Sequence, residues 1–316
     1  IVNWNVRDLL AGCLDSIYTD LAQSGGALSG AVCVVDNDSS DGSAEMVRAQ
    51  FPATQLIAAE NRGMGAGNNR GLRALVEQYQ PFALLVLNPD TVVRPGALRS
   101  LVDFLRANRR AGVAAPKLLY PDGRLQHAGF RFPGFTQALF DLYPPPGRLA
   151  RLMDSPLNGR YAASRYQAGS PFQVDHTLGA AFAVRAEAAA ECGLFDESFQ
   201  MYCEEIDWQW RIARAGWERW VVPAAEVVHY GGQSTAQVKA ESLARLWTSR
   251  RRLYHRYHSP ALNAVLNPLV RFTMRQRIRA NHRRSQRGLM GADERAALNQ
   301  ALGDVIRVWE QRRPPL

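Results

Sequence analysis

The chain has 316 residues, 47% of them hydrophobic, which is enough for a sizeable core and excludes a disordered or fibrous protein. Its formal net charge of +9 comes from one segment, because eleven arginines and no acidic residue lie between positions 250 and 287. Four scattered cysteines without metal-finger spacing argue against a disulfide framework, and no run approaches the roughly 18 apolar residues of a membrane span.

The first residues, IVNWN, are typical of the end of a strand and not of a secretion leader, so we expect a few residues upstream of Ile1. Further β-rich runs follow at 31–36 (AVCVVD), 54–59 (TQLIAA) and 82–88 (FALLVLN), separated by amphipathic helical stretches. This alternation predicts an α/β fold with a mostly parallel central sheet flanked by helices. Ligands bind such sheets at the carboxyl ends of the strands, so the loops there are the candidate sites.

The loop DNDSSDGS follows the run at 31–36. Asp41, with Gly42 and Ser43, is suited to cap the next helix. Asp36 lies directly at the strand end, where its carboxylate could accept a hydrogen bond from the imide N–H of a pyrimidine base. Three carboxylates in so short a loop, Asp38 being the third, repel one another unless donors or a ligand compensate, which favours a binding role.

The glycine-rich loop NRGMGAGNN only partly matches a dinucleotide fingerprint. It lacks the final glycine at the required spacing, and no acidic partner is clearly placed downstream. The pattern instead predicts a helix that begins close to a strand. Asn61, Arg62 and Asn68 are candidates for contacts with a nucleotide.

The next loop, NPDT, places Asn88 and Asp90 two positions apart at a strand end. They lie on the same side if the backbone stays extended. Amide and carboxylate oxygens there suit a hard divalent cation that is itself bound to phosphate oxygens. The same four residues also form good turns, so the loop alone leaves both possibilities open.

The pattern loosens between about 133 and 175, where YPPPG and DSPLNGR interrupt regular structure; a lid, an acceptor-side insertion and a plain surface excursion are all compatible with it. A helix is then predicted over EEIDWQWRIARAG, with Ile206, Trp210 and Ala213 facing the core and Gly216 ending it.

The first turn of this helix holds three acids, Glu204, Glu205 and Asp207. The helix dipole favours acids there, and Asp207 could simply pair with Arg211 four positions later. A carboxylate near Trp208 and its aromatic neighbours is also partly desolvated, which raises its proton affinity toward that of a general base. The triplet is therefore a candidate base for a sugar hydroxyl.

The motif VVHYGGQST ends a β-branched run with His229, which could be a structural histidine or a ligand. Beyond residue 235 the sequence predicts a helix to about 258 and a last helix from about 293 to 312. The apolar stretch 259–273 lies within the arginine-rich segment 250–287, a combination that suits the surface of an anionic membrane. A solvated helix face or an oligomer contact is the alternative.

Six motifs in this order resemble those of one known family: VVDNDSSDGS, ENRGMGAGNNRG, LNPDT, GAAFAVRAE, GLFDESFQMYCEEIDWQWRIARAGW and VVHYGGQST. They resemble the family 2 glycosyltransferases, in particular a bacterial rhamnosyltransferase-like branch. The resemblance covers roughly residues 1–235, and it implies the GT-A fold, with a nucleotide-binding part over about 1–120 and an acceptor-binding part over about 121–235. Residues 236–316 would then be a helical, arginine-rich extension.

Carried onto this sequence, the resemblance assigns Asp36, and less directly Asn37 or Asp38, to the nucleotide base. Asn88 and Asp90 occupy the family's Asp-x-Asp position, here with Asn first, so that Asp90 contacts the metal and Asn88 the ribose or a bridging water.

Glu205 stands at the position of the catalytic base, with Glu204 and Asp207 as alternatives. His229 matches a histidine that completes the metal site with Asp90 in some members, the metal being Mn²⁺ or Mg²⁺. Gly179 is assigned to the nucleotide-sugar site.

The resemblance thus implies an inverting, metal-dependent transfer of sugar from a nucleoside-diphosphate sugar, dTDP-rhamnose or a UDP-sugar, to a glycan or lipid-linked acceptor. We expect a cytoplasmic enzyme of cell-envelope polysaccharide synthesis, held peripherally at the inner face of the membrane by the 250–287 arginines, and an oligomer is possible. A nucleotidyltransferase and a nucleic-acid-binding protein are the alternatives, although acidic loops at the strand ends disfavour nucleic acid.

Overall fold

Helices and strands alternate through the first part of the chain, as the hydrophobic runs predict. The computed structural model describes residues 1–232 and 238–311. Its first elements are β1 (Val2–Asn3), α1 (Arg7–Gln23), β2 (Cys33–Asn37), α2 (Ser43–Gln50), β3 (Gln55–Ala59), α3 (Met64–Tyr79), β4 (Ala83–Leu87), β5 (Thr91–Val93), α4 (Ala97–Ala107) and β6 (Ala111–Leu119). The strands predicted at 31–36, 54–59 and 82–88 are confirmed as β2, β3 and β4.

The middle of the chain is built from shorter elements. They are β7 (Leu125–Gln126), β8 (Gly129–Phe130), α5 (Phe135–Leu142), the 3₁₀ helices η1 (Gly147–Asp154) and η2 (Pro156–Asn158), α6 (Ala163–Gln167), β9 (Phe172–Gln173), β10 (His176–Thr177), β11 (Ala181–Arg185), α7 (Ala186–Cys192), α8 (Glu204–Arg214) and β12 (Glu218–His229). The interruption of regular structure expected over 133–175 is therefore incomplete, since α5 and α6 form between the prolines.

The chain continues with three long helices, α9 (Lys239–Tyr257), α10 (Pro260–Gln286) and α11 (Ala292–Glu310). The helices predicted to about 258 and from about 293 are confirmed as α9 and α11, while position 312 lies outside the described residues. Among the described residues, no helix is long and apolar enough to cross a membrane.

The strands form two larger sheets and a two-stranded pair of β8 with β10. The strands β1, β2 and β3 are parallel, as the alternation predicts. The seven-stranded sheet has the order β4-β11-β6-β12-β5, with β7 on β6 and β9 on β12. Here β6 and β12 are parallel, whereas β11 runs antiparallel to both β4 and β6. The pairing is thus more mixed than expected, because an apolar run buried on both faces does not reveal its direction.

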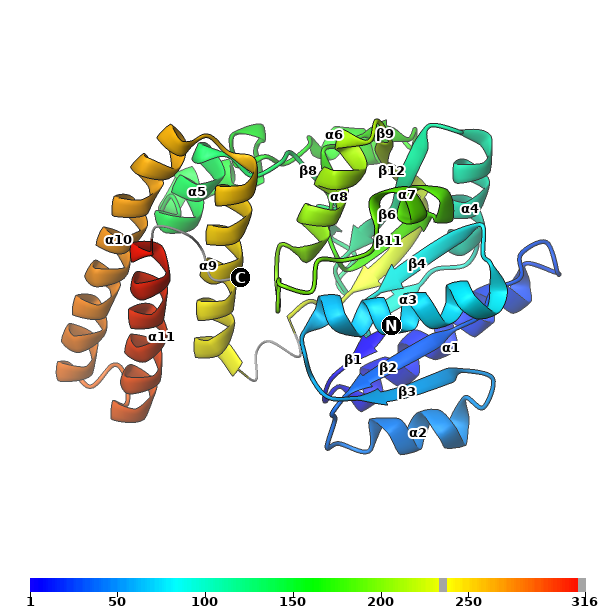
Figure 1. Ribbon diagram of the computed structural model, residues 1–316, viewed down its shortest axis with the longest axis horizontal. Helices are drawn as coiled ribbons and strands as arrows, with labels where there is room; N and C mark the ends of the chain where they lie inside the picture. The colour runs from blue at the N-terminus through cyan, green and yellow to red at the C-terminus, as the bar shows by residue number, and fades with distance from the viewer. Residues whose placement is uncertain (233–237, 312–316) are drawn as a thin grey trace.

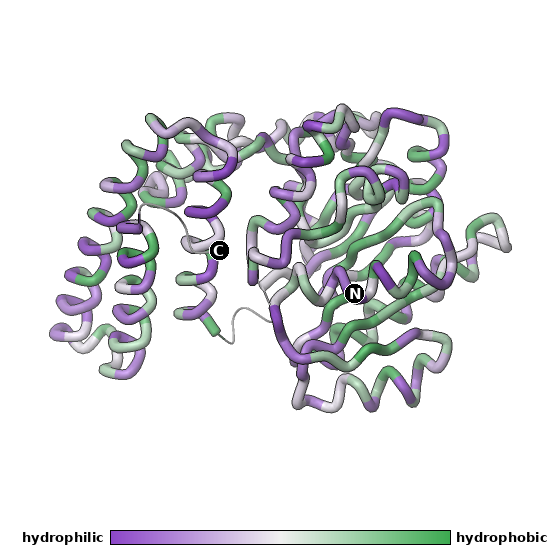
Figure 2. Tube along the Cα trace, viewed as in Figure 1, coloured by the Kyte–Doolittle hydropathy of each residue, from purple (hydrophilic) through white to green (hydrophobic). Residues whose placement is uncertain are grey.

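Helices cover both sheets, and the strands form the hydrophobic interior in Figure 2. The helix predicted to begin close to a strand is α3. A Cβ on Gly67 would lie 2.9 Å from Cγ1 of Val2, and one on Gly71 would lie 3.2 Å from Cγ2 of Val35. These glycines therefore let α3 pack directly on β1 and β2.

Helix α8 packs against the seven-stranded sheet through Trp208 and Ile212, both of which are fully buried. The prediction that Ile206, Trp210 and Ala213 face this core is wrong, since these three side chains are only partly buried. Ile206 and Trp210 pack on the opposite side, in a cluster that includes residues of α9. Both faces of the helix are covered, so periodicity alone did not identify the inner one. Gly216, with φ of +89°, ends the helix as predicted.

The C-terminal helices form a second core beside the sheets (Figure 1). Trp247 of α9, Val270 of α10 and Trp309 of α11 are buried together. Ala138 and Leu142 of α5 belong to the same cluster. The excursion within 133–175 is thus neither a free lid nor a plain surface loop over its first part, because α5 packs as a fourth member of the helical group.

Candidate active site

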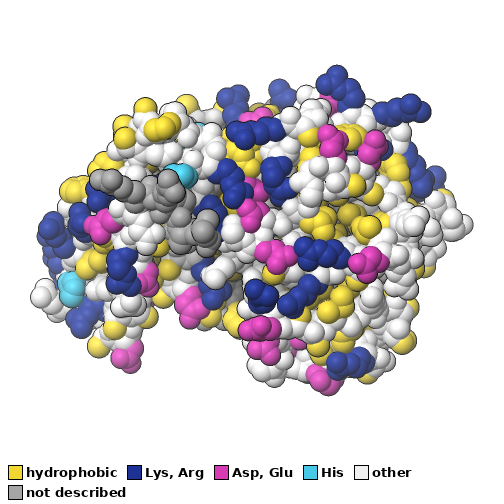
Figure 3. All heavy atoms as spheres, in the orientation of Figure 1, with side chains coloured by type: hydrophobic (Ala, Val, Ile, Leu, Met, Phe, Trp, Pro, Cys, Tyr) yellow, Lys and Arg dark blue, Asp and Glu magenta, His cyan; other side chains and the backbone are white. Residues whose placement is uncertain are grey.

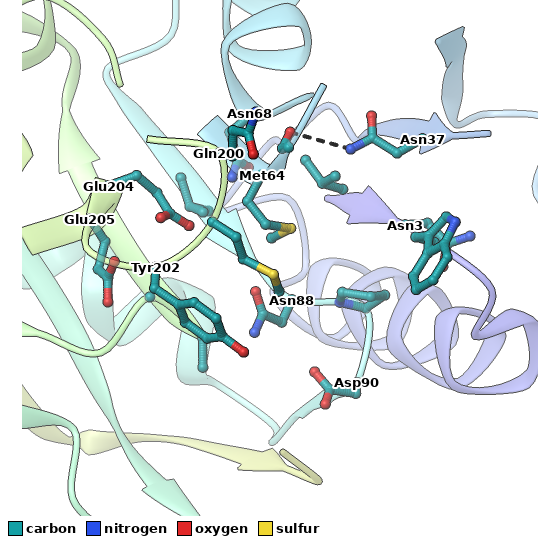
Figure 4. A pocket seen from close by; sticks show the side chains of 18 of the residues that line it. Asn3, Asn37, Met64, Asn68, Asn88, Asp90, Gln200, Tyr202, Glu204 and Glu205 are labelled. Carbon is teal, nitrogen blue, oxygen red and sulfur yellow. Dashed lines mark hydrogen bonds between the residues drawn. The ribbon is translucent and has the colours of Figure 1, made fainter. Parts of the chain in front are cut away.

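A cavity of about 480 Å³ opens where the loops after β1 and β4 meet the start of α8. Figure 4 shows Glu204 and Glu205 on one side of it, Asn3 and Asn37 on the other, and Asn88 between them. Most of the predicted site residues are brought together here, from segments as distant as β1 and α9. The position at the carboxyl ends of the strands agrees with the general rule for α/β sheets.

The acid pair of α8 lines this cavity. Glu204 is 8% exposed, and its Oε2 has no hydrogen-bond partner among the described residues. Burial raises the pKa of Glu204 well above its usual value, and the neighbouring charge of Glu205 raises it further. Burial also raises the pKa of Glu205, to about 7. A carboxylate with a pKa near neutrality can both accept a proton and release it at physiological pH, as a general base requires.

Gly179 stands directly against this pair. A Cβ at that position would lie 3.2 Å from Cγ and 3.4 Å from Cδ of Glu205. The glycine also lines the cavity. Its lack of a side chain therefore leaves room for the Glu205 carboxylate at the cavity wall.

Asp90 and His229 meet at another part of the wall, with 3.3 Å between Asp90 Oδ1 and His229 Nε2. Gln126 Oε1 lies 2.9 Å from His229 Nδ1. Because a carboxamide oxygen only accepts hydrogen bonds, Nδ1 donates to it, and this contact turns Nε2 toward the Asp90 carboxylate. A carboxylate oxygen and an imidazole nitrogen that face each other in this way fit a divalent metal.

The side chains of this pair do not enclose a metal by themselves. Within residues 1–232 and 238–311, no group of three or more His, Cys, Asp or Glu side chains is arranged to hold one. A cation held by Asp90 and His229 would keep most of its coordination positions for other oxygens, as is usual for hard cations that bind through substrate phosphates.

Amide side chains form much of the remaining wall: Asn3, Asn37, Asn61, Asn68 and Asn88. Asn37 Nδ2 donates to the carbonyl oxygen of Gly63 at 3.4 Å, which connects the end of β2 to the start of α3. Amides both donate and accept, so such a wall can bind hydroxyls and base edges without adding charge.

Three predicted nucleotide ligands are not among the residues that line the cavity. Asp36 is buried, and its two carboxylate oxygens accept hydrogen bonds from Asn3 Nδ2 at 3.0 Å and from the Ser39 amide at 3.1 Å. Asp38 is exposed in a left-handed conformation with φ of +64°. Arg62 is also exposed. Asp36 thus shapes the end of β2 through its contacts with Asn3, which does line the cavity.

Other predictions concern local structure. The N-cap of α2 is Gly42 and not Asp41, although Asp41 Oδ1, one position earlier, accepts from the Ser43 amide at 3.1 Å. Asp207 lies outside the cavity and is fully buried. Its carboxylate accepts from Arg211 Nε at 3.0 Å, which is the pairing that the i, i+4 spacing indicates. After His229, Gly231 and Gly232 adopt left-handed φ of +75° and +69°, and the rest of that motif, 233–235, lies outside the described residues.

The sequence analysis did not identify several residues that line the cavity. Asn3 is the last residue of β1 and Trp4 follows it, and applying the strand-end rule to IVNWN would have found them. Tyr202 also lines the wall, and Arg245 of α9 is its only lysine or arginine among the described lining residues. Gln126, which orients His229, carried no sequence signal.

The chain is similar in sequence to one protein family and to several known proteins. Residues 1–254 match the family described as Glycosyltransferase like family 2. The chain is similar to an N-acetylglucosaminyl-diphospho-decaprenol L-rhamnosyltransferase of Mycobacterium tuberculosis, with 29% identity over 81% of this chain and 86% of that protein. It is also similar to the rhamnosyltransferase WbbL of Escherichia coli, with 25% identity over 57% of this chain and 65% of that protein.

Two solved structures share the fold. One is the mannosyltransferase PcManGT of Pyrobaculum calidifontis in complex with GDP-Man and Mn²⁺, with a TM-score of 0.54 and 15% identity over 96% of this chain and 84% of that one. The other is GalNAc-T7 with UDP, GalNAc and Mn²⁺, with a TM-score of 0.54 and 13% identity. This second likeness covers 80% of this chain but only 46% of GalNAc-T7.

The predicted α/β fold of the GT-A type and the predicted enzyme class are confirmed by these comparisons. The family match spans most of the chain, including the acid pair, Asp90 and His229. The protein is a transferase and belongs to glycosyltransferase family 2.

Proposed function

We propose that this protein transfers a sugar from a nucleoside-diphosphate sugar, dTDP-rhamnose or a UDP-sugar, to a hydroxyl of a glycan or lipid-linked acceptor, with inversion at the anomeric carbon. The observation that carries the proposal is the presence of the acid pair Glu204–Glu205 and the Asp90–His229 pair in one cavity. The rhamnosyltransferases to which the chain is similar favour rhamnose as the sugar and cell-envelope polysaccharide as the product.

Glu205 is the base in this proposal. A sugar hydroxyl is a weak nucleophile at neutral pH, and a pKa of about 7 suits the Glu205 carboxylate to accept its proton during attack on the anomeric carbon. Attack from the face opposite the nucleotide breaks the bond to the diphosphate and inverts the centre in one displacement. Burial raises the pKa of Glu204 well above its usual value and so favours its protonated form, which can donate a hydrogen bond to a substrate oxygen.

Asp90 and His229 would hold Mn²⁺ or Mg²⁺. Such an ion, when bound, neutralises charge on the diphosphate leaving group as a Lewis acid. Gln126 fixes the ring of His229 with Nε2 toward Asp90. Arg245, on the α9 side of the cavity, pairs with Glu241 at 3.1 Å, and its guanidinium could turn from that partner to a donor or acceptor phosphate.

In this proposal, each of the three parts of the chain has its own function. Residues from about 1 to 120 bind the nucleotide through their asparagines, and about 121 to 235 supply the acid pair and the acceptor side. The helices within 236–316 place the enzyme at an anionic membrane surface, on the cytoplasmic side.

The membrane-facing surface is the outer face of α10. Val265 and Phe272, seven positions apart, are 54% and 55% exposed. Arg279, a further seven positions along, continues the same face, and Arg283 and Arg284 follow. None of these three arginines has an ion pair within the described residues. The outer face of α10 is thus apolar in its first half and basic in its second half, which suits contact with the acyl chains and anionic headgroups of a membrane.

The first test is thermal stability with UDP, dTDP or GDP, each with and without Mn²⁺, because a ligand of the folded state raises the melting temperature. We expect one diphosphate to stabilise the protein, and to do so only with metal. Turnover of the matching nucleotide sugar with an N-acetylglucosaminyl diphosphate lipid should then be lost in Glu205→Gln while nucleotide binding is retained. An active Glu205→Gln enzyme would contradict the assignment of the base, and pyrophosphate release from a nucleoside triphosphate would instead indicate a nucleotidyltransferase.

A further inference from the structure

The loop that precedes the acid pair has an unusual backbone. Tyr202 and Cys203, immediately before Glu204, both have φ of +67°. Residues with a side chain adopt this left-handed region only at a cost in free energy, and two in succession are rare. The loop and the first turn of α8 therefore need contacts from elsewhere to stay in this conformation.

Helix α9 supplies contacts to the loop. Ser249 Oγ donates a hydrogen bond to the carbonyl oxygen of Met201 at 2.7 Å. The guanidinium of Arg252 donates to the carbonyl oxygen of Ser198 and lies over the ring of Phe199, 5.4 Å from its centroid. Each bond fixes the backbone of the segment that leads into the acid pair.

The same helix also holds α8 itself, through Asp207. Oδ1 of this buried carboxylate accepts from Arg256 Nη1 at 2.6 Å and from the Tyr257 hydroxyl at 2.8 Å. The other amino group of Arg256 lies 2.7 Å from Asp196 Oδ2, at the start of the loop. Tyr257 stacks on Trp210 with 4.2 Å between ring centroids and 9° between the planes. Arg256 thus ties both ends of the segment 196–207 to α9.

We infer that Arg256 and Tyr257 are positioning residues for catalysis, which hold the acid pair toward the cavity through Asp207 without touching substrate. Neither residue lines the cavity. Figure 1 shows α9 between α8 and the other C-terminal helices, where it can carry out this role. The inference rests on the proposed role of Glu205 as the base. It gives the C-terminal region a part in the chemistry as well as in membrane contact.

The test compares Arg256→Gln with Arg250→Gln. Arg250 lies on the same helix, but its ion pair of 2.7 Å is with Asp141 of α5 and not with the segment 196–207, so it is a matched control. We expect Arg256→Gln to lower kcat at least about tenfold and to shift the pH profile of kcat/KM, while the affinity for the nucleoside diphosphate stays within about twofold. Arg250→Gln should lower the melting temperature while kcat and the pH profile are unchanged.

Tyr257→Phe removes only one oxygen and keeps the test decisive if Arg256→Gln does not fold. A smaller fall in kcat with the same shift of the pH profile is expected. Normal kcat and a normal pH profile in both variants, or in Tyr257→Phe when it alone folds, would overturn the inference. Turnover by Glu205→Gln would instead overturn the proposed base, which separates the two failures. Activity is measured with dTDP-rhamnose, or with the UDP-sugar if UDP is the stabilising diphosphate.

Discussion

Glu204 and Glu205 are adjacent in sequence and lie in the same cavity wall, so ionising one makes it harder to ionise the other. Two such carboxyls lose their protons in successive steps that belong to the pair. One group can act as a base while the other remains a hydrogen-bond donor, although both residues are of the same type.

This pair predicts how the rate depends on pH. Since the pKa of Glu205 is raised to about 7, the carboxylate form that accepts a proton is lost as the pH falls through that value. We expect kcat/KM to decline about tenfold per pH unit below neutrality. A profile measured from pH 5 to 9 checks this, with the circular dichroism spectrum as a control for folding. A rate that stays constant down to pH 5 would rule out a base with a raised pKa.

A second prediction concerns the glycine beside Glu205. Gly179→Ala would place a methyl group 3.2 Å from Cγ of Glu205, so the carboxylate must shift by a few tenths of an ångström or more. We expect kcat to fall about tenfold with little change in melting temperature. Gly303→Ala in α11, where an added Cβ meets nothing within 4 Å, should leave kcat unchanged. Equal kcat in the two variants would mean that Gly179 has no role in placing the base.

Gln126 gives a third prediction. Gln126→Leu keeps the approximate size of the side chain but removes the oxygen that accepts from His229 Nδ1. The ring can then rotate or change tautomer, so we expect the affinity for Mn²⁺ to fall about 10-fold to 100-fold. Calorimetric titration of Mn²⁺ in the presence of the nucleoside diphosphate measures this directly. Unchanged affinity would show that the contact with Gln126 is not needed to orient His229 toward the metal.

At the scale of helices and strands, close packing explains which glycines cannot be replaced. Gly67→Ala would place a Cβ 2.9 Å from Cγ1 of Val2, which forces α3 away from β1. We expect a loss of about 1–3 kcal/mol in the free energy of unfolding. Gly12→Ala in α1, where the added Cβ meets nothing within 4 Å, should instead gain about 0.5–1 kcal/mol. Urea denaturation of both variants tests the prediction, which fails if Gly67→Ala is as stable as the native protein.

The elements themselves were largely predictable, because hydrophobic runs and periodicity depend on local sequence. The direction of β4 relative to its partner strand and the face of α8 that packs on the sheet were not predictable. Strand β4 pairs with β11, some hundred residues later, and that partner cannot be identified from the run at 82–88. Trp210 was assigned to the core from its helical spacing with Ile206 and Ala213, yet it stacks on Tyr257 of a distant helix. Contacts between segments far apart in the chain decide such questions.

The candidate site likewise contains some residues that local sequence identifies and others that depend on distant contacts. Asp90, Glu204 and Glu205 were found because acids at strand ends and in a helical first turn are visible in the sequence. Asp36 was expected in the site, but its oxygens accept hydrogen bonds from Asn3 on the neighbouring strand β1 and from the Ser39 amide in the loop after β2.

At the scale of the whole molecule, the arginines of the segment 250–287 divide into two groups. Those of α9 are used inside the protein: Arg251 is 2% exposed, and Arg250 and Arg256 pair with acids. In α10, Arg271 and Arg275 pair with Glu310 and Arg277 donates to carbonyl oxygens of α5, whereas Arg279, Arg283 and Arg284 have no ion pair within the described residues. Arginine and lysine side chains gather along the outer edge of the helical group in Figure 3. The charge available to a membrane is therefore smaller than the sequence suggests and lies in the last part of α10.

The last prediction follows from this division. Replacing Arg279, Arg283 and Arg284 with Gln removes three charges, each worth about 1 kcal/mol at an anionic surface, so binding to vesicles with 30% phosphatidylserine should weaken by roughly 100-fold. A variant with Arg48, Arg110 and Arg124 replaced by Gln loses the same net charge from exposed positions outside α10 and should bind normally. Flotation at low and high salt measures both. If the two triple variants lose binding equally, net charge and not the face of α10 determines attachment.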